Sequence, residues 1–178
     1  MNGNISLSRD KTRHLLEGLE NMSSGIDLSN DQEKAFATLW HEIWHNTNKA
    51  NSTLLTKTER QYMELGNEFT ARKTLDDFFD LFGTKLKNEA LRSDRSDTGY
   101  NNWVRNFDVL ISHYHADEAG VITYMKDKMK NGDYNQMKTY LREAIIKNSS
   151  ETIKLSELNS ALRDALSYPE NYFAEKFK

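Results

Sequence analysis

The chain of 178 residues contains no cysteine, a single proline and only eight glycines. The lack of cysteine excludes disulfide bonds and thiol catalysis. Because proline and glycine interrupt helices, their scarcity favours a mainly helical protein. Long apolar runs are also missing, and residues 1–10 lack the apolar core of a signal peptide. We therefore expect no membrane span and, by default, a cytoplasmic protein.

An excess of charge of one sign is absent as well. The 24 lysine and arginine residues and 27 acidic residues give a formal net charge of −3 and a pI near 6.0. The lysines are spread along the chain, whereas proteins that bind nucleic acids or membrane surfaces usually carry a basic cluster. The composition therefore predicts no direct nucleic-acid partner and no membrane partner.

One stretch, residues 35–46, carries the pattern of a metal site. It reads AFATLWHEIWHN and places His41, Glu42 and His45 in the spacing His-Glu-x-x-His. Residues four apart lie on one face of a helix, so both imidazoles can bind one tetrahedral cation, for which zinc is the natural choice. Glu42 would lie beside the metal, where its carboxylate can take a proton from water. The pattern predicts a hydrolase, and the alternative is an amphipathic helix with two incidental histidines.

A third ligand is expected from residues 65–82, where an apolar stripe contains a carboxylate. The stripe comprises Leu65, Glu68, Ala71 or Arg72, Leu75, Phe79 and Phe82. An ionised carboxylate on an apolar face is costly unless it is paired or bound to a cation. Glu68 is therefore the predicted third ligand, although taken alone it could instead form a buried ion pair with Arg72 or Arg60. Glu64, one turn earlier, is the alternative ligand, with Glu68 then supporting the site from behind.

Two motifs together resemble the glutamate-zincin metallopeptidases. They are HEIWH at residues 41–45 and NEFTA at residues 67–71, and the resemblance covers about residues 30–82. The longer metzincin motif is absent, because Asn48 and Asn51 stand where that class has a glycine and a third histidine. The resemblance therefore implies a zincin-like helical core with at most a small β-sheet.

The roles of the family fall on four residues of this chain. The resemblance implies that His41, His45 and Glu68 bind zinc, that Glu42 is the catalytic base, and that the substrate is a peptide or protein. Residues 35–40 are also similar to metallopeptidase modules in large proteins of phages and mobile elements. The rival interpretation is an inert zincin-like module that binds or supports a partner, within such a protein.

The rest of the chain is expected to form helices around this core. Residues 4–8 alternate like a short strand, the histidine helix should be capped by Ser29 or Asn30, and the polar residues 93–99 mark the one break in composition. Helices are expected near residues 11–22, 30–46, 65–82, 101–115, 117–130, 134–147 and 155–167, with a short one after Pro169. We predict a metal-binding part in residues 1–92 and a helical part in residues 93–178, packed as one compact unit.

The reaction would also need a donor for the oxyanion of its intermediate. Tyr100, His113 and Tyr114 are the candidates, and the sequence does not choose among them. His113 and His115 point away from the apolar stripe of their helix, which predicts surface positions for both.

Overall fold

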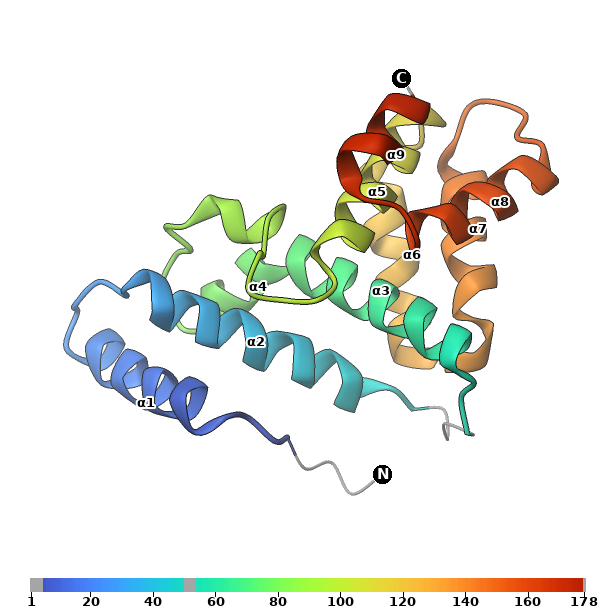
Figure 1. The fold of residues 1–178 in the computed structure, drawn as a ribbon. Helices are drawn as coiled ribbons and strands as arrows, with labels where there is room; N and C mark the ends of the chain where they lie inside the picture. The colour runs from blue at the N-terminus through green and yellow to red at the C-terminus, as the bar shows by residue number, and fades with distance from the viewer. Residues whose placement is uncertain (1–4, 50–53, 178) are drawn as a thin grey trace.

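The structure, a computed structural model, describes residues 5–49 and 54–177. The regular structure of these residues is helical. These ranges contain nine α-helices and two short 3-10 helices but no β-strand (Figure 1), which confirms the mainly helical prediction. The elements are α1 (Arg9–Ser23), α2 (Asn30–Thr47), α3 (Lys57–Lys73), α4 (Leu75–Asp80), η1 (Glu89–Arg92), α5 (Asn101–His113), α6 (Glu118–Asn131), η2 (Tyr134–Gln136), α7 (Met137–Asn148), α8 (Leu155–Ala165) and α9 (Glu170–Lys176). None of the described helices is both long and apolar enough to span a membrane.

The short strand expected at residues 4–8 is wrong for the part that is described, residues 5–8, while Asn4 lies outside it. Residues 5–8 have no regular structure, and Ser8 instead caps α1 by accepting a hydrogen bond from the Lys11 amide. A strand needs a partner to pair with, and the described residues offer none. The alternating pattern of these few residues therefore does not produce a strand, and the segment leads into helix α1.

Helix α2 begins as the sequence predicts. The Ser29 hydroxyl accepts from the Gln32 amide, and the Gln32 side chain accepts from the Ser29 amide, which completes a capping box. Of its apolar residues, Phe36 and Trp44 are buried, and Leu39, Trp40 and Ile43 are half-buried. Helix α1 packs along one side of α2 and helix α3 along another (Figure 1), so the two histidines project from a helix that is enclosed on several sides.

Helix α3 is the centre of the molecule. It packs against α2, α5, α6 and α7, and ten of its residues between Tyr62 and Arg72 are buried. Gly66 allows the close approach, because a Cβ there would lie 2.7 Å from the sulfur of Met137. The apolar stripe expected at residues 65–82 is buried as far as Phe79, but the helix is interrupted at Thr74, which lies between the end of α3 and the start of α4.

Two apolar clusters make up the core. The larger one joins α3 to the C-terminal helices, and the smaller one lies between α1, the first half of α2, α4 and the segment around η1. Trp40 packs against both clusters and links them. Helix α3 thus shares its cluster with helices of the C-terminal half. The predicted division of the chain at residue 93 stays a prediction.

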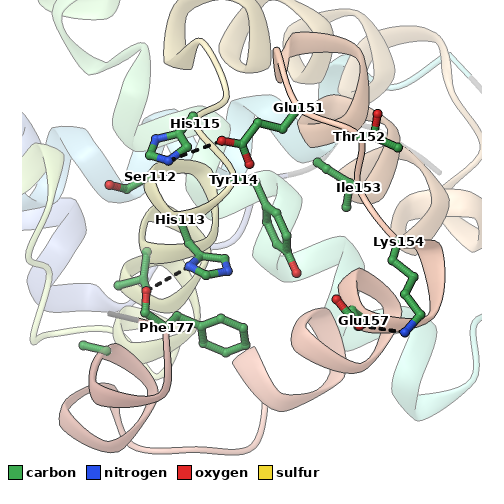
Figure 2. A pocket seen from close by; sticks show the side chains of 12 residues that line it. Ser112, His113, Tyr114, His115, Glu151, Thr152, Ile153, Lys154, Glu157 and Phe177 are labelled. Carbon is green, nitrogen blue, oxygen red and sulfur yellow. Dashed lines mark hydrogen bonds and ion pairs between the residues drawn. The ribbon is translucent and has the colours of Figure 1, made fainter.

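A cleft of about 820 Å³ lies at the C-terminal end of α5, where this helix meets α8 and α9 (Figure 2). His113, Tyr114 and His115 line it. The ring of His113 donates through Nδ1 to the carbonyl of Phe177, at 3.0 Å. Both histidines are exposed, in agreement with the surface positions expected for them.

A candidate metal centre between two helices

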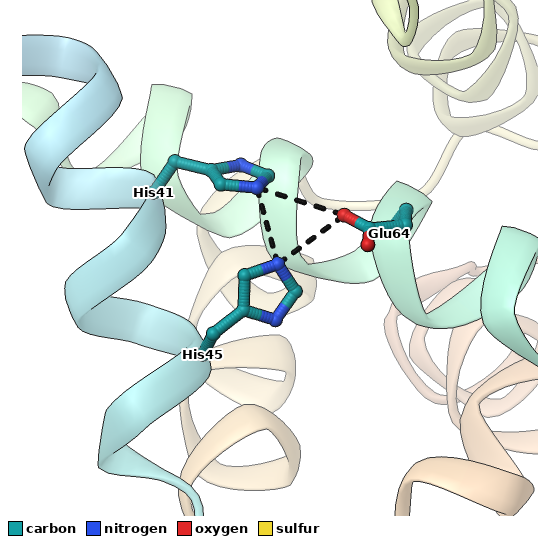
Figure 3. Close-up of side chains that lie close together, drawn as sticks. All are labelled: His41, His45 and Glu64. Atoms are coloured by element: carbon teal, nitrogen blue, oxygen red, sulfur yellow. Dashed lines mark hydrogen bonds and ion pairs between the residues drawn. The ribbon is translucent and has the colours of Figure 1, made fainter. Parts of the chain in front are cut away.

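Three side chains converge between α2 and α3. His41 and His45, one turn apart on α2, face Glu64 on α3 (Figure 3). The Nε2 atoms of the two histidines lie 3.1 Å apart, and the Glu64 Oε2 atom lies 3.2 Å from His45 Nε2 and 3.6 Å from His41 Nε2. The His-Glu-x-x-His spacing therefore does bring both imidazoles to one point, as the helix geometry predicts.

The spacing and chemistry of this group fit a metal ion. Ligands that lie about 2.0 to 2.2 Å from zinc in a tetrahedron are about 3.3 to 3.6 Å from one another, close to the separations between the three atoms here. Two imidazole nitrogens and one carboxylate oxygen also form a known ligand set of catalytic zinc sites, which leave the fourth position open. His41, His45 and Glu64 are thus a group that could hold a metal ion.

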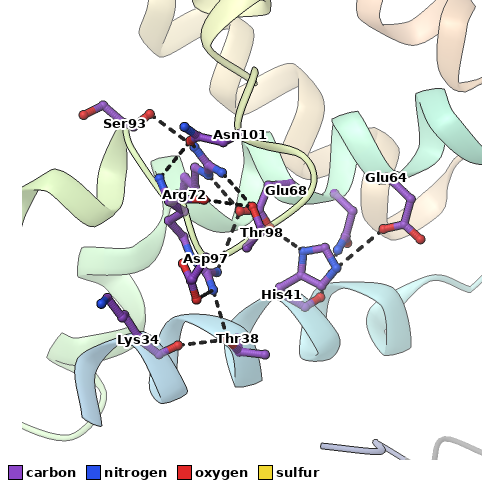
Figure 4. Close-up of polar contacts among 12 residues, drawn as sticks. Lys34, Thr38, His41, Glu64, Glu68, Arg72, Ser93, Asp97, Thr98 and Asn101 are labelled. Carbon is purple, nitrogen blue, oxygen red and sulfur yellow. Dashed lines mark hydrogen bonds and ion pairs between the residues drawn. The ribbon is translucent and has the colours of Figure 1, made fainter. Parts of the chain in front are cut away.

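Glu68, the predicted third ligand, lies on the other edge of the His41 ring. Its Oε2 atom is 2.6 Å from His41 Nδ1, while its Oε1 atom accepts from Arg72 Nε at 2.8 Å (Figure 4). Arg95 Nη1 lies 3.7 Å from the same Oε1 atom. The ion pair with Arg72, one of the alternatives for Glu68, is therefore formed. It is Glu64, the alternative ligand, that shares the Nε2 side with both histidines.

Hydrogen-bond chemistry fixes which nitrogen of His41 faces the cluster. Burial works against the charge of Glu68, but the hydrogen bond from His41 and the charges of Arg95 and Arg72 lower the pKa of Glu68 to about 2. An ionised carboxylate can only accept, so Nδ1 of His41 carries a proton and donates it. Its Nε2 atom is then the one available to a metal. Such carboxylate support at the far nitrogen orients metal-binding histidines in many proteins.

Charges in the cluster are strongly coupled in the metal-free protein. Burial opposes the charged form of His41, but hydrogen bonds and charges of Glu64 and Glu68 outweigh it and raise the pKa of His41 to about 9. Burial also opposes the charged form of Glu64, yet hydrogen bonds from His41 and His45 lower the pKa of Glu64 to about 2. Without metal, His41 is therefore a cation at neutral pH, and a metal ion at Nε2 would displace its proton.

A segment between η1 and α5 closes the back of the site. Arg95, only 2% exposed, donates to Thr38 of α2 at 2.9 Å and pairs with Asp97 at 3.2 Å. Arg72 donates to Asn101 at 2.8 Å, and the Arg95 amide donates to the same Asn101 oxygen at 2.8 Å (Figure 4). Residues 93–99, expected only to mark a boundary, thus supply a buried cation behind Glu68. A single sequence gives no signal for this role, because Arg95 lies in a polar stretch.

The cluster opens into a cleft of about 560 Å³. Its lining consists of His41, Glu42, His45, Leu54, Leu55, Arg60, Met63, Glu64, Tyr100 and Tyr134. The Glu42 side chain, the predicted base, makes no hydrogen bond or ion pair with any residue that the structure describes. Glu42 therefore lines the same cleft as the three converging side chains, with its carboxylate unengaged.

One of the three candidates for the oxyanion donor lies at this cleft. The Tyr100 ring stacks on His41, with ring centres 5.9 Å apart and planes 10° from parallel. Burial, followed by the negative charges of Glu64 and Glu68, raises the pKa of Tyr100, which keeps its hydroxyl protonated. His113 and Tyr114 line the other cleft (Figure 2). Sequence reasoning did not single out Tyr134, whose hydroxyl donates to the His45 carbonyl at 3.2 Å.

Comparison with known proteins found no matching family model, no matching curated protein and no matching solved structure.

Proposed function

We propose that this protein is a zinc-dependent hydrolase of peptide bonds. In this proposal His41, His45 and Glu64 bind the metal, and Glu42 is the catalytic base. The observation that carries it is the convergence of three ligand atoms, 3.1 to 3.6 Å from one another, on a cleft that Glu42 also lines. Glu42 is assigned to proton transfer because it follows the first histidine of the His-Glu-x-x-His motif.

Glu42, Tyr100 and Glu68 have separate tasks in the proposed reaction. When bound, zinc supplies Lewis-acid chemistry, which polarises a carbonyl and lowers the pKa of water. Glu42 takes the proton of the attacking water and passes it to the leaving amine. The Tyr100 hydroxyl donates a hydrogen bond to the oxyanion. Glu68 holds the His41 ring through Nδ1, so that Nε2 stays directed at the ligand group.

Glutamine at position 42 tests this proposal, because the amide keeps the size of the side chain but cannot accept a proton. Glu42→Gln is expected to retain one zinc per chain and to lose roughly 100-fold or more of the peptide-cleavage rate. Asp31→Asn is the matched control, since it removes an exposed carboxylate from the same helix. The measurements are metal content by mass spectrometry and cleavage of a broad peptide library.

Three results would count against the proposal. If zinc-loaded wild-type protein cleaves no peptide in the library, an inert metal-binding module is the better description. If Glu42→Gln cleaves as fast as wild type, the base is a different group. A metal content near zero in zinc-supplemented protein would remove the metal site itself.

A further inference from the structure

The cleft beside the ligand group is lined by a cation, Arg60, that has no partner in the part of the chain that the structure describes. Arg60 is the single lysine or arginine in the lining, and it is exposed. Its guanidinium forms no hydrogen bond or ion pair within residues 5–49 and 54–177. Glu64, one turn further along α3, is engaged by the two histidines. A free guanidinium in a cleft is suited to a carboxylate, which it can bind through two parallel hydrogen bonds.

Apolar side chains line the same cleft as this cation. Leu54 is fully exposed at the edge of the cleft, Leu55 is half-buried, and Met63 forms part of the wall. Tyr134 lines the cleft as well. One concave surface thus presents an exposed leucine and an arginine that has no hydrogen-bond or ion-pair partner among residues 5–49 and 54–177. Their natural occupant is therefore a molecule that offers an apolar group and a negative charge together.

The position of Arg60 determines how far from the ligand group a bound carboxylate would lie. Four residues of helix separate it from Glu64, which corresponds to about 6 Å along the axis. An extended peptide covers about 3.3 Å per residue. A carboxylate on Arg60 would therefore lie one or two residues from a peptide bond held at the ligand group.

We propose that the cleft selects peptides with an apolar side chain and, one or two residues from the scissile bond, a carboxylate that pairs with Arg60. This substrate class rests on the proposed function. The carboxylate can be the side chain of an acidic residue or the C-terminus of the peptide, because both present the same group to a guanidinium.

Binding to zinc-loaded Glu42→Gln protein tests the inference without cleavage. The probes are fluorescent hexapeptides with one leucine, in which glutamate or glutamine stands one or two residues to either side. A second pair of peptides ends one residue after the leucine in a free carboxylate or in an amide. In fluorescence anisotropy, the preferred acidic peptide is expected to bind roughly tenfold more tightly than its neutral match, the gain of one charge-assisted contact.

Arg60→Met in the same background should remove this preference, while Arg60→Lys should retain part of it. Lys57→Met is the matched control, because it removes a positive charge from an exposed position of α3 that does not line the cleft. It should leave the preference intact.

Equal binding of acidic and neutral peptides, or a preference that survives Arg60→Met, would overturn the inference. So would the absence of binding by every peptide. A preference that depends on Arg60, found together with no cleavage by wild type, would instead support the cleft specificity and count against hydrolysis.

Discussion

Replacing Glu68 and Glu64 separately by glutamine is expected to affect different properties of the protein. The two carboxylates lie one turn apart on α3 and contact opposite edges of the His41 ring. Glu68 is 1% exposed and faces Arg72 and Arg95, whereas Glu64 is half-buried at the cleft. Glu68→Gln should therefore mainly destabilise the fold, and Glu64→Gln should mainly remove the metal.

The size of the folding effect follows from the charges left behind. Glutamine at position 68 would leave the buried guanidiniums of Arg72 and Arg95 without their shared anion. Removing one partner of a buried ion pair costs about 3 to 5 kcal/mol. Burial opposes the charged form of Glu68, but the hydrogen bond from His41 and the charges of Arg95 and Arg72 outweigh it and lower the pKa of Glu68, so these partners hold the carboxylate in its ionised form. Among the described residues, Glu64 forms its ion pairs with His41 and His45 and pairs with no arginine or lysine, and its side chain is only half-buried, so the loss of stability at position 64 should be smaller.

The effects on metal binding should rank in the opposite order. If Glu68 supports His41 from behind, its loss should weaken zinc by roughly 10- to 100-fold, as for other outer partners of metal ligands. Loss of Glu64 should exceed that range, because a ligand atom is removed. Urea unfolding in the presence of a chelator measures the first effect, and competition with a coloured zinc chelator measures the second.

Two outcomes would refute this reasoning. If Glu64→Gln keeps wild-type zinc affinity while Glu68→Gln loses the metal, then Glu68 is the ligand, as the apolar stripe predicts. If Glu68→Gln unfolds at the same urea concentration as wild type, the buried charge network does not contribute as described.

Two further outcomes are expected. Zinc affinity should fall by up to about tenfold for each pH unit below about 9, because carboxylates outweigh burial and raise the pKa of His41 to about 9, and zinc must displace that proton. A competition titration at several pH values checks this, and an affinity independent of pH would contradict it. Thr74→Val should cost about 2 kcal/mol or more, because the indoles of Trp40 and Trp44 both donate to the Thr74 hydroxyl, at 2.9 and 3.1 Å. Urea unfolding measures the loss, with Thr74→Ser as a control of near wild-type stability.

The helices could be predicted from the sequence because their signals are local. The capping box at Ser29 and the scarcity of proline and glycine determine structure within a few residues. The break at Thr74 was not predictable in this way, since no proline or glycine lies near it, and the indoles that donate to its hydroxyl belong to another helix. The short strand expected at residues 4–8 failed at residues 5–8 for a related reason, because pairing depends on a partner elsewhere in the chain.

The candidate site, too, could be predicted from the sequence only in part. The approach of His41 and His45 follows from their spacing on one helix. The choice of Glu64 or Glu68 as the third ligand does not follow from sequence spacing. A carboxylate on an apolar face shows only that some cation must compensate its charge. Here the compensating groups of Glu68 include Arg95, which is 27 residues away in sequence and is brought in by a polar segment.

The arrangement of α2 and α3 links the roles of Glu64 and Glu68. Two histidines spaced by four residues on α2 face two glutamates spaced by four residues on α3. One turn of helix covers about 5.4 Å, so a single imidazole can contact both carboxylates, one at each nitrogen. His41 does so, with Glu68 at Nδ1 and Glu64 at Nε2. Because a ring nitrogen that donates to a carboxylate leaves the other nitrogen to the metal, Glu68 cannot support His41 in this way and also bind a metal at Nε2. The roles of the two glutamates are therefore linked, and assigning one of them assigns the other.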